Sequence, residues 1–121
     1  MDKLVVMKEL FDTYYKHSEP DWDSFGASPV TIPNYIAAVT LLNSLPEEMP
    51  QPKIWVNCDN QFCFYWGSRD KDLFSISITS SLEIDCVGTC NGTTFSGNST
   101  LNAPEFLEYV RIMVHKITSK E

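Results

Sequence analysis

The chain has 121 residues, of which 43% are hydrophobic and 12% aromatic, and its sixteen acidic and nine basic residues give a net charge of −7 at pH 7. This length suits a single domain (1–121) whose core needs no disulfide, and no stretch approaches the roughly 20 apolar residues of a membrane-spanning helix. The negative charge repels phosphate backbones and anionic lipid surfaces, which argues against direct binding to nucleic acids or membranes.

Residues 3–17 are expected to form the first helix. Leu4, Met7, Phe11 and Tyr14 follow the i, i+3, i+7, i+10 spacing of one apolar helical stripe. The same segment mixes acids and lysines with its apolar residues and contains no small-residue cleavage site, so it does not resemble a signal peptide. We therefore expect a cytoplasmic protein.

The segment after this helix, SEPDWDSFGASPV (18–30), is expected to be an irregular loop because it contains two prolines and a glycine. Its two aromatic residues, Trp22 and Phe25, allow two interpretations. They can fold back as a lid on the edge of the core, or they can form an exposed binding surface together with their acidic neighbours. The sequence leaves both interpretations open.

A second helix is expected to begin near Thr31, a suitable N-cap, with Pro33 tolerated in the first turn. Its body, YIAAVTLLNSL (35–45), is apolar nearly all the way round, which predicts the most buried helix of the domain. Three prolines in LPEEMPQP (45–52) should end this helix and favour an extended crossing.

After residue 52 the pattern changes to short runs that are rich in β-branched and aromatic residues. Turn-forming sequences separate the runs, which predicts a meander of four or five antiparallel strands. In one run Phe74, Ile76 and Ile78 alternate with serine and threonine, so one face of the sheet should be covered and the other should face water. The runs are KIWVN, QFCFYWG, DLFSISITS, LEIDCVG and TTFSG.

The last helix is expected within NAPEFLEYVRIMVHKI (102–117). Asn102 is a possible N-cap, and Glu105 three residues later completes a variant of the capping box. The predicted fold class is therefore α+β, an antiparallel four- or five-stranded meander with two N-terminal helices and one C-terminal helix packed on one face. The apolar stripe of the last helix is Phe106, Val110, Met113, Val114 and Ile117.

The four cysteines are expected to be reduced thiols in the cytoplasm. Their spacings, C-x4-C and C-x3-C, suggest a zinc site at first. Cys63, however, lies between two phenylalanines in a predicted strand, where a small buried hydrophobic residue is ordinary. Cys58 and Cys90 lie in or beside turns and are free to approach one another. We expect no metal site and no cofactor.

The two histidines, His17 and His115, lie near the ends of predicted helices, where a positive charge complements the helix C-terminus. No nucleophile motif accompanies either of them. The acidic pairs 21/23, 47/48, 70/72 and 83/85 are equally typical of a solvated surface. We therefore expect no catalytic residues, and a small enzyme with an unrecognised Cys–His or carboxylate site is the alternative.

The acidic charge is concentrated between residues 12 and 59, a segment that contains seven acidic and two basic residues. Aromatic residues beside acids are typical of protein-binding surfaces, and strand alternation places Tyr65 on the water-facing side of the sheet. We expect a protein partner with a basic surface, a nucleic-acid-binding complex being one candidate. The expected partner-binding residues are Asp21, Trp22, Asp23, Phe25, Glu47, Glu48 and Tyr65.

The segment WDSFGASPV (22–30), followed by a helix, an LP…MPQP segment and strands ending in YWG, resembles a diffuse set of small bacterial and phage proteins. Those proteins carry a W-D-x-[aromatic]-G-A-x-P loop, a helix, a Leu-Pro…Pro-x-Pro segment and strands containing a tryptophan. The resemblance covers roughly residues 20–78 and departs from the pattern at CDNQF (58–62), where an Asp-Gly turn is more typical. It implies a prokaryotic or phage origin and no particular mechanism, because no enzymatic activity is assigned to those proteins. Its most specific residues are Trp22, Gly26, Ala27, Pro29, Pro46, Pro52 and Trp66.

Three functional hypotheses follow from these patterns. The favoured one is a non-enzymatic acidic protein-binding module, an inhibitor comparable to antitoxins, immunity proteins and anti-CRISPR-like phage anti-defence proteins, that occupies a basic macromolecular partner. The second is the small enzyme described above. The third is a homo-oligomeric structural or accessory subunit, for example a homodimer, whose exposed sheet face or edge is covered by its own copy.

Overall fold

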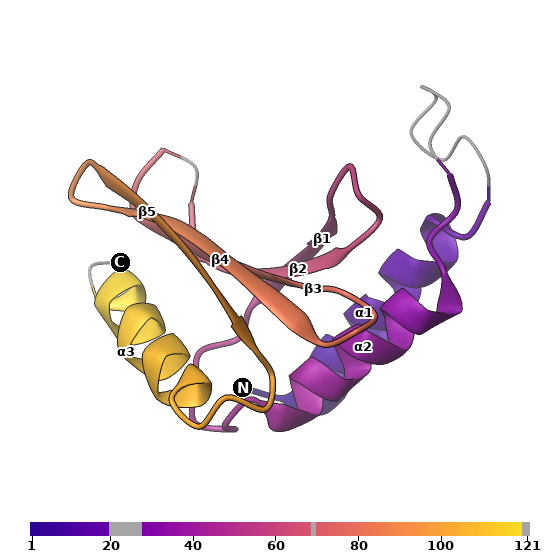
Figure 1. Ribbon diagram of the computed structural model, residues 1–121, viewed down its shortest axis with the longest axis horizontal. Coiled ribbons are helices and arrows are strands. Elements are labelled where there is room, and N and C mark those ends of the chain that lie inside the picture. Colours follow the sequence, from indigo (N-terminus) through magenta and orange to yellow (C-terminus); the bar gives the residue numbers. More distant parts are fainter. Residues whose placement is uncertain (20–27, 69, 120–121) are drawn as a thin grey trace.

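The structure, a computed structural model, describes residues 1–19, 28–68 and 70–119. Five antiparallel strands form one sheet in the order β1-β2-β3-β4-β5, and the three helices lie on one face of it (Figure 1). This confirms the α+β class and decides the strand number. With 13 or 14 residues each, the described helices fall short of the length and hydropathy that a transmembrane helix requires. The elements are α1 (Lys3–Lys16), α2 (Ile32–Ser44), β1 (Lys53–Val56), β2 (Phe62–Gly67), β3 (Leu73–Ile78), β4 (Glu83–Cys90), β5 (Thr93–Thr100) and α3 (Phe106–Thr118).

The apolar stripe expected for α1 is wrong for Leu4 and Phe11, whereas Met7 and Tyr14 are partly buried and pack against the core. Val6 and Leu10 are fully buried in the core, whereas Leu4 and Phe11 are 82% and 52% exposed. Both sets fit a helical period because this segment is apolar over much of its circumference. Packing against α2 and β1 selects the Val6 side, and the other apolar side of the helix is left on the surface.

The second helix begins as expected. The Thr31 hydroxyl accepts a hydrogen bond from the Asn34 amide (3.3 Å), and Pro33 lies in the first turn. Ile32 and Ile36 are nevertheless exposed, so α2 is not buried all the way round. Its buried residues are Ala37, Ala38, Leu41 and Leu42.

The third helix begins at Phe106, later than the cap expected at Asn102. Ala103 precedes Pro104, and a residue before proline is disfavoured in the α conformation, so the chain turns instead of starting a helix. The turn is closed by the Phe106 amide, which donates to the Ala103 carbonyl (3.2 Å). Glu105 then occupies the N-cap position without a side-chain hydrogen bond to the helix.

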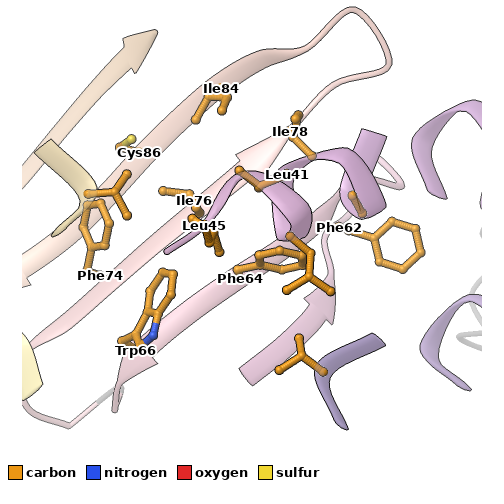
Figure 2. Close-up of a cluster of buried hydrophobic side chains, with 14 of the residues drawn as sticks. Leu41, Leu45, Phe62, Phe64, Trp66, Phe74, Ile76, Ile78, Ile84 and Cys86 are labelled. Atoms are coloured by element: carbon orange, nitrogen blue, oxygen red, sulfur yellow. The ribbon is translucent and has the colours of Figure 1, made fainter. Parts of the chain in front are cut away.

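The core lies between the helices and the inner face of the sheet (Figure 2). Strand alternation directs Phe62, Phe64 and Trp66 of β2 toward the helices. Leu41 of α2 and Leu45, the C-cap of this helix, lie over this face. Each such side chain contributes about 1.5–3 kcal/mol when it is fully buried. The adjoining strands add Phe74, Ile76, Ile78, Ile84 and Cys86.

The outer face of the sheet carries a small apolar hollow of about 370 Å³. Tyr65 lies on this face, as strand alternation predicted, with Trp55 and Val87 lining the same hollow. Ser75 lies at its base and is only 9% exposed, so the expectation that the serines of β3 face water is wrong for Ser75. Its Cα partners on the neighbouring strands, Tyr65 and Val87, have larger side chains that shield Ser75 from water.

Candidate functional site

The last strand, β5, is an open edge of the sheet. It pairs with β4 along its whole length, and no described element pairs with its other side. Its sequence TTFSGNST contains neither charge nor proline, which are features that protect natural edge strands from pairing with other chains. Every second residue of Thr93–Thr100 therefore directs an unprotected backbone donor and acceptor away from the sheet, while the others bond to β4.

A two-residue turn holds β5 against β4. Asn91 and Gly92 have φ angles of 53° and 80°, as the left-handed positions of a type I′ hairpin require. The Asp72 carboxylate accepts a hydrogen bond from the Asn91 amide (3.0 Å) and so connects this turn to the β2–β3 turn. The turn and this hydrogen bond together hold the start of β5 in place.

A groove of about 470 Å³ runs between β5 and α3 on the helix side of the sheet. Tyr109 and Ile112 of α3 form one wall and are 39% and 48% exposed. Cys86 and its Cα partner Gly97 belong to the opposite side of the groove. A Cβ atom added at Gly97 would meet no atom within 4 Å, so the space beside β5 is open at this residue.

Three aromatic rings support one end of this groove. Phe74 stacks on Phe95 (6.2 Å between ring centroids) and meets the Tyr109 ring edge-on (6.0 Å). The Phe95 ring occupies the space over Gly88, where a Cβ atom would overlap it. Such aromatic pairs contribute about 0.5–1.5 kcal/mol beyond their burial and hold Tyr109 in place.

Carboxylates form the rim of the groove and continue beyond it. Glu105 and Glu108 line the groove itself. An adjoining hollow of about 550 Å³ shares Glu105 with the groove and adds Glu83 and Asp85. Among the described residues, no lysine, arginine or histidine lines either hollow. The groove is therefore apolar inside with an acidic rim, whereas the adjoining hollow is mostly polar, and strand alternation directs its Glu83 and Asp85 side chains away from the helices.

Arg111, on α3, neutralises part of this charge. Its guanidinium lies 3.0 Å from a Glu48 oxygen and 3.7 Å from a Glu108 oxygen. All three side chains are at least half exposed, so solvent screens these ion pairs and each contributes less than about 1 kcal/mol. The Glu108 carboxylate can therefore exchange Arg111 for a cationic ligand at little cost.

The thiol in the groove, Cys86, is not activated as a nucleophile. It is buried, and burial together with the nearby Asp85 charge raises its pKa from 9.0 to about 11, so it is protonated at neutral pH. Burial also raises the pKa of Tyr109. The described part of the chain holds no group of three or more metal-ligating side chains. The site thus offers apolar contacts, charge and hydrogen bonds; that the protein lacks an active site, a metal and a cofactor stays a prediction.

The remaining cysteines and the histidines lie apart from the groove. Cys58 follows β1 and Cys90 ends β4, and in an antiparallel meander these turns are at opposite ends of the sheet, so the two thiols, which the sequence left free to approach one another, lie apart. Cys63 is buried, as expected, and burial raises its pKa to about 12. His17 is the C-cap of α1, and its Nδ1 donates to the Thr13 carbonyl (2.6 Å).

The structure separates the partner-binding residues that the sequence suggested. Glu48 reaches Arg111 on the helix-covered side of the sheet, and Glu47 precedes it in the turn after α2, whereas Tyr65 lies on the outer face. Glu47 and Glu48 therefore do not share a surface with Tyr65. The other four, Asp21, Trp22, Asp23 and Phe25, lie outside the described residues.

Sequence reasoning missed the groove residues. Tyr109 and Ile112 are apolar but fall outside the stripe of α3, and this was the signal that the helix has a second apolar side. Gly97 within a predicted strand was the other signal, because glycine in a strand often marks a close approach of another backbone or a ligand. Glu105 was assigned to capping, and only the turn at Pro104 places its carboxylate at the groove.

Comparison with known proteins gave no match: no protein-family model, no curated protein and no solved structure is significantly similar to this chain.

Thiol reactivity provides a first check of the described burial. Cys58 is exposed and should react with a disulfide reagent such as DTNB within the mixing phase, and the half-buried Cys90 should follow more slowly. Cys63 and Cys86 should react only after unfolding, because both are buried and protonated at neutral pH. Four equally fast thiols in the native protein would contradict this arrangement; mass spectrometry of the labelled peptides assigns each rate.

Proposed function

We propose that this protein is a non-enzymatic interaction module that binds an extended, basic segment of a partner protein. The segment adds to β5 as a sixth strand. The observation that carries this proposal is the unprotected edge of β5 beside a groove with apolar walls and an acidic rim. Peptides that add to a sheet edge gain affinity from main-chain hydrogen bonds and specificity from pockets for alternate side chains.

The groove determines which side chains the added segment should carry. Successive side chains of a strand point to opposite faces, so every second side chain enters the groove on the helix side. Large apolar side chains fit against Tyr109 and Ile112, while lysine or arginine reaches Glu105 and Glu108 at the rim. The net charge of −7 accelerates the encounter with a basic surface.

We infer from this chemistry that the protein acts as an inhibitor, comparable to an antitoxin or a phage anti-defence protein in the cytoplasm. Proteins that handle nucleic acids expose basic segments, and an acidic module that covers such a segment competes with the nucleic acid. The resemblance of residues 20–78 to small bacterial and phage proteins agrees with this setting.

The test uses two substitutions in the same strand. Gly97→Val places a branched side chain in the open space of the groove, which the side chains of an added strand would need to enter, and its Cβ atom meets no atom of the monomer within 4 Å. Ser96→Val is the matched control, because Ser96 is the Cα partner of Val87 and points to the outer face. Tagged wild-type, Gly97→Val and Ser96→Val proteins are used to capture host-cell proteins at low and at moderate salt, followed by mass spectrometry.

We expect wild type and Ser96→Val to retain a basic protein, and we expect its binding to weaken as the salt concentration rises. Gly97→Val should retain at least tenfold less of this protein. Both variants should keep the wild-type melting temperature within a few degrees. Equal retention by all three proteins would place the binding site away from β5. Retention of no basic protein under either salt condition would reject the proposed function for that host.

A further inference from the structure

We propose that the outer surface of the two N-terminal helices is a homodimer interface, occupied by a second copy of this chain. This surface, here called the helical face, does not include the β5 groove, and the proposal does not depend on the proposed function. It consists of Leu4, Phe11 and Tyr15 of α1 and Ile32 and Ile36 of α2.

The helical face is the largest group of exposed apolar side chains in the described structure. Leu4, Phe11 and Tyr15 are 82%, 52% and 71% exposed and follow an i, i+7, i+11 spacing, so they form one stripe along α1. Ile32 and Ile36 are one turn apart on α2 and are 61% and 57% exposed. None of the five contributes to the buried core of the monomer.

The two stripes lie next to each other. The helices run antiparallel and side by side, away from α3 (Figure 1), with the Tyr14 and Tyr35 rings 4.7 Å apart at one end of the pair. At the other end, the Lys3 ammonium donates to the Asn43 carbonyl (3.2 Å). This pairing places Tyr15 at the level of Ile32 and Phe11 at the level of Ile36. The exposed apolar residues of α1 and α2 therefore lie at matching levels on neighbouring helices, with Leu4 extending the α1 stripe toward the other end of the pair.

The charge of the helical face identifies its occupant. No residue of α2 is charged, and α1 carries three lysines and two acids, although the whole chain has a net charge of −7. A basic partner gains nothing electrostatically from this surface, whereas a second copy meets no repulsion there. Copies that met through the acidic groove would bring like charges together. The helical face combines an apolar surface with no excess of negative charge, which suits it to self-association.

The size of the helical face also fits a dimer. At 150–250 Å² for a large side chain, the five residues together expose on the order of 600 Å². This is at the upper end of the largest apolar patch found on typical monomers, about 300–600 Å². Two copies related by a two-fold axis would bury about 1,200 Å² through these side chains alone, which reaches the range of stable interfaces. The product is a four-helix layer between two sheets.

The test compares one substitution at two isoleucines of similar exposure. Ile36→Lys introduces a charge at the centre of the helical face, and Ile112→Lys introduces the same charge on α3, where the isoleucine is 48% exposed. Sedimentation equilibrium of the full chain over a concentration series measures the mass of wild type and both variants. Circular dichroism confirms that both variants are folded, as expected for substitutions of exposed residues.

We expect wild type and Ile112→Lys to be dimers and Ile36→Lys to be a monomer, with a dissociation constant raised at least a hundredfold. A monomeric wild type at the highest concentration would overturn the proposal. A dimer that survives Ile36→Lys would overturn it as well, because the interface would lie elsewhere. The same proteins separate this proposal from the proposed function: Ile112→Lys should impair capture of a basic partner without affecting the dimer, and Ile36→Lys should do the reverse.

Discussion

Gly67→Ala should lower the free energy of unfolding by about 3 kcal/mol or more. Gly67 has a φ of +95°, a region that costs an L residue about 1–2 kcal/mol. An added Cβ would also overlap the Asp72 carbonyl oxygen and approach Ile117 Cγ2 of α3 to 2.8 Å. The oxygen belongs to the backbone of the same tight turn, which cannot move away cheaply, and overpacking of this kind adds about 1–3 kcal/mol.

Urea denaturation of Gly67→Ala and of the matched variant Gly97→Ala measures this effect. Gly97 is also a strand glycine, but its φ is not positive and an added Cβ meets nothing within 4 Å. Gly97→Ala should therefore stay within about 1 kcal/mol of wild type, with a gain rather than a loss as the expected sign. Equal stability of the two variants would show that the turn at Gly67 relaxes and that the close approach of Gly67 to Ile117 does not restrict this position.

Raising the pH above 9 should destabilise the protein through its two buried thiols. Burial raises the pKa of Cys63 from 9.0 to about 12 and that of Cys86 from 9.0 to about 11. At a pH above 9.0 but below the raised pKa of each thiol, the unfolded chain loses the thiol proton while the folded protein keeps it. The stability that depends on these two protonated thiols is therefore fully present below pH 9 and is lost as the pH rises toward 11 for Cys86 and 12 for Cys63. Each thiol lowers the free energy of unfolding by up to about 1.4 kcal/mol per pH unit in this pH range.

The measurement is urea denaturation at several pH values from 8 to 10.5, with wild type and the double variant Cys63→Ala, Cys86→Ala. Wild type should lose on the order of 3 kcal/mol over this range. The double variant should start from a lower stability, because two small cavities form, and should show a flatter pH profile. An identical slope in both proteins would assign the alkaline destabilisation to other groups, such as tyrosines and lysines.

The strand pattern was readable from the sequence because its signals are local. Alternation through Phe74, Ile76 and Ile78 set the inner face of β3, and a turn-forming sequence that includes Asn91 and Gly92 separated the last two strands. The N-cap at Thr31 was equally local, since one hydroxyl and one amide three residues later decide it. Neighbouring residues along the chain contain all of this information.

The orientation of α1 was not readable in the same way. Its sequence fits an apolar stripe through Leu4 and Phe11 as well as one through Val6 and Leu10. Which stripe is buried depends on where α2 and β1 lie, and these elements are far away in the sequence. The start of α3 at Phe106, later than the expected N-cap at Asn102, has a local cause that the capping pattern did not indicate: Pro104 disfavours a helical conformation of Ala103.

The candidate site depended even more on tertiary structure. The sequence determined the acidic charge, the α+β class, the burial of Cys63 and the placement of Tyr65 on the outer face, because composition and strand period are properties of the chain itself. Only the fold decided that β5 is an edge, that Glu105 and Glu108 border one groove with Tyr109, and that the apolar sides of α1 and α2 adjoin. Each of these depends on contacts between segments that the sequence does not place side by side, and burial in the core uses only some of the apolar residues that the chain supplies.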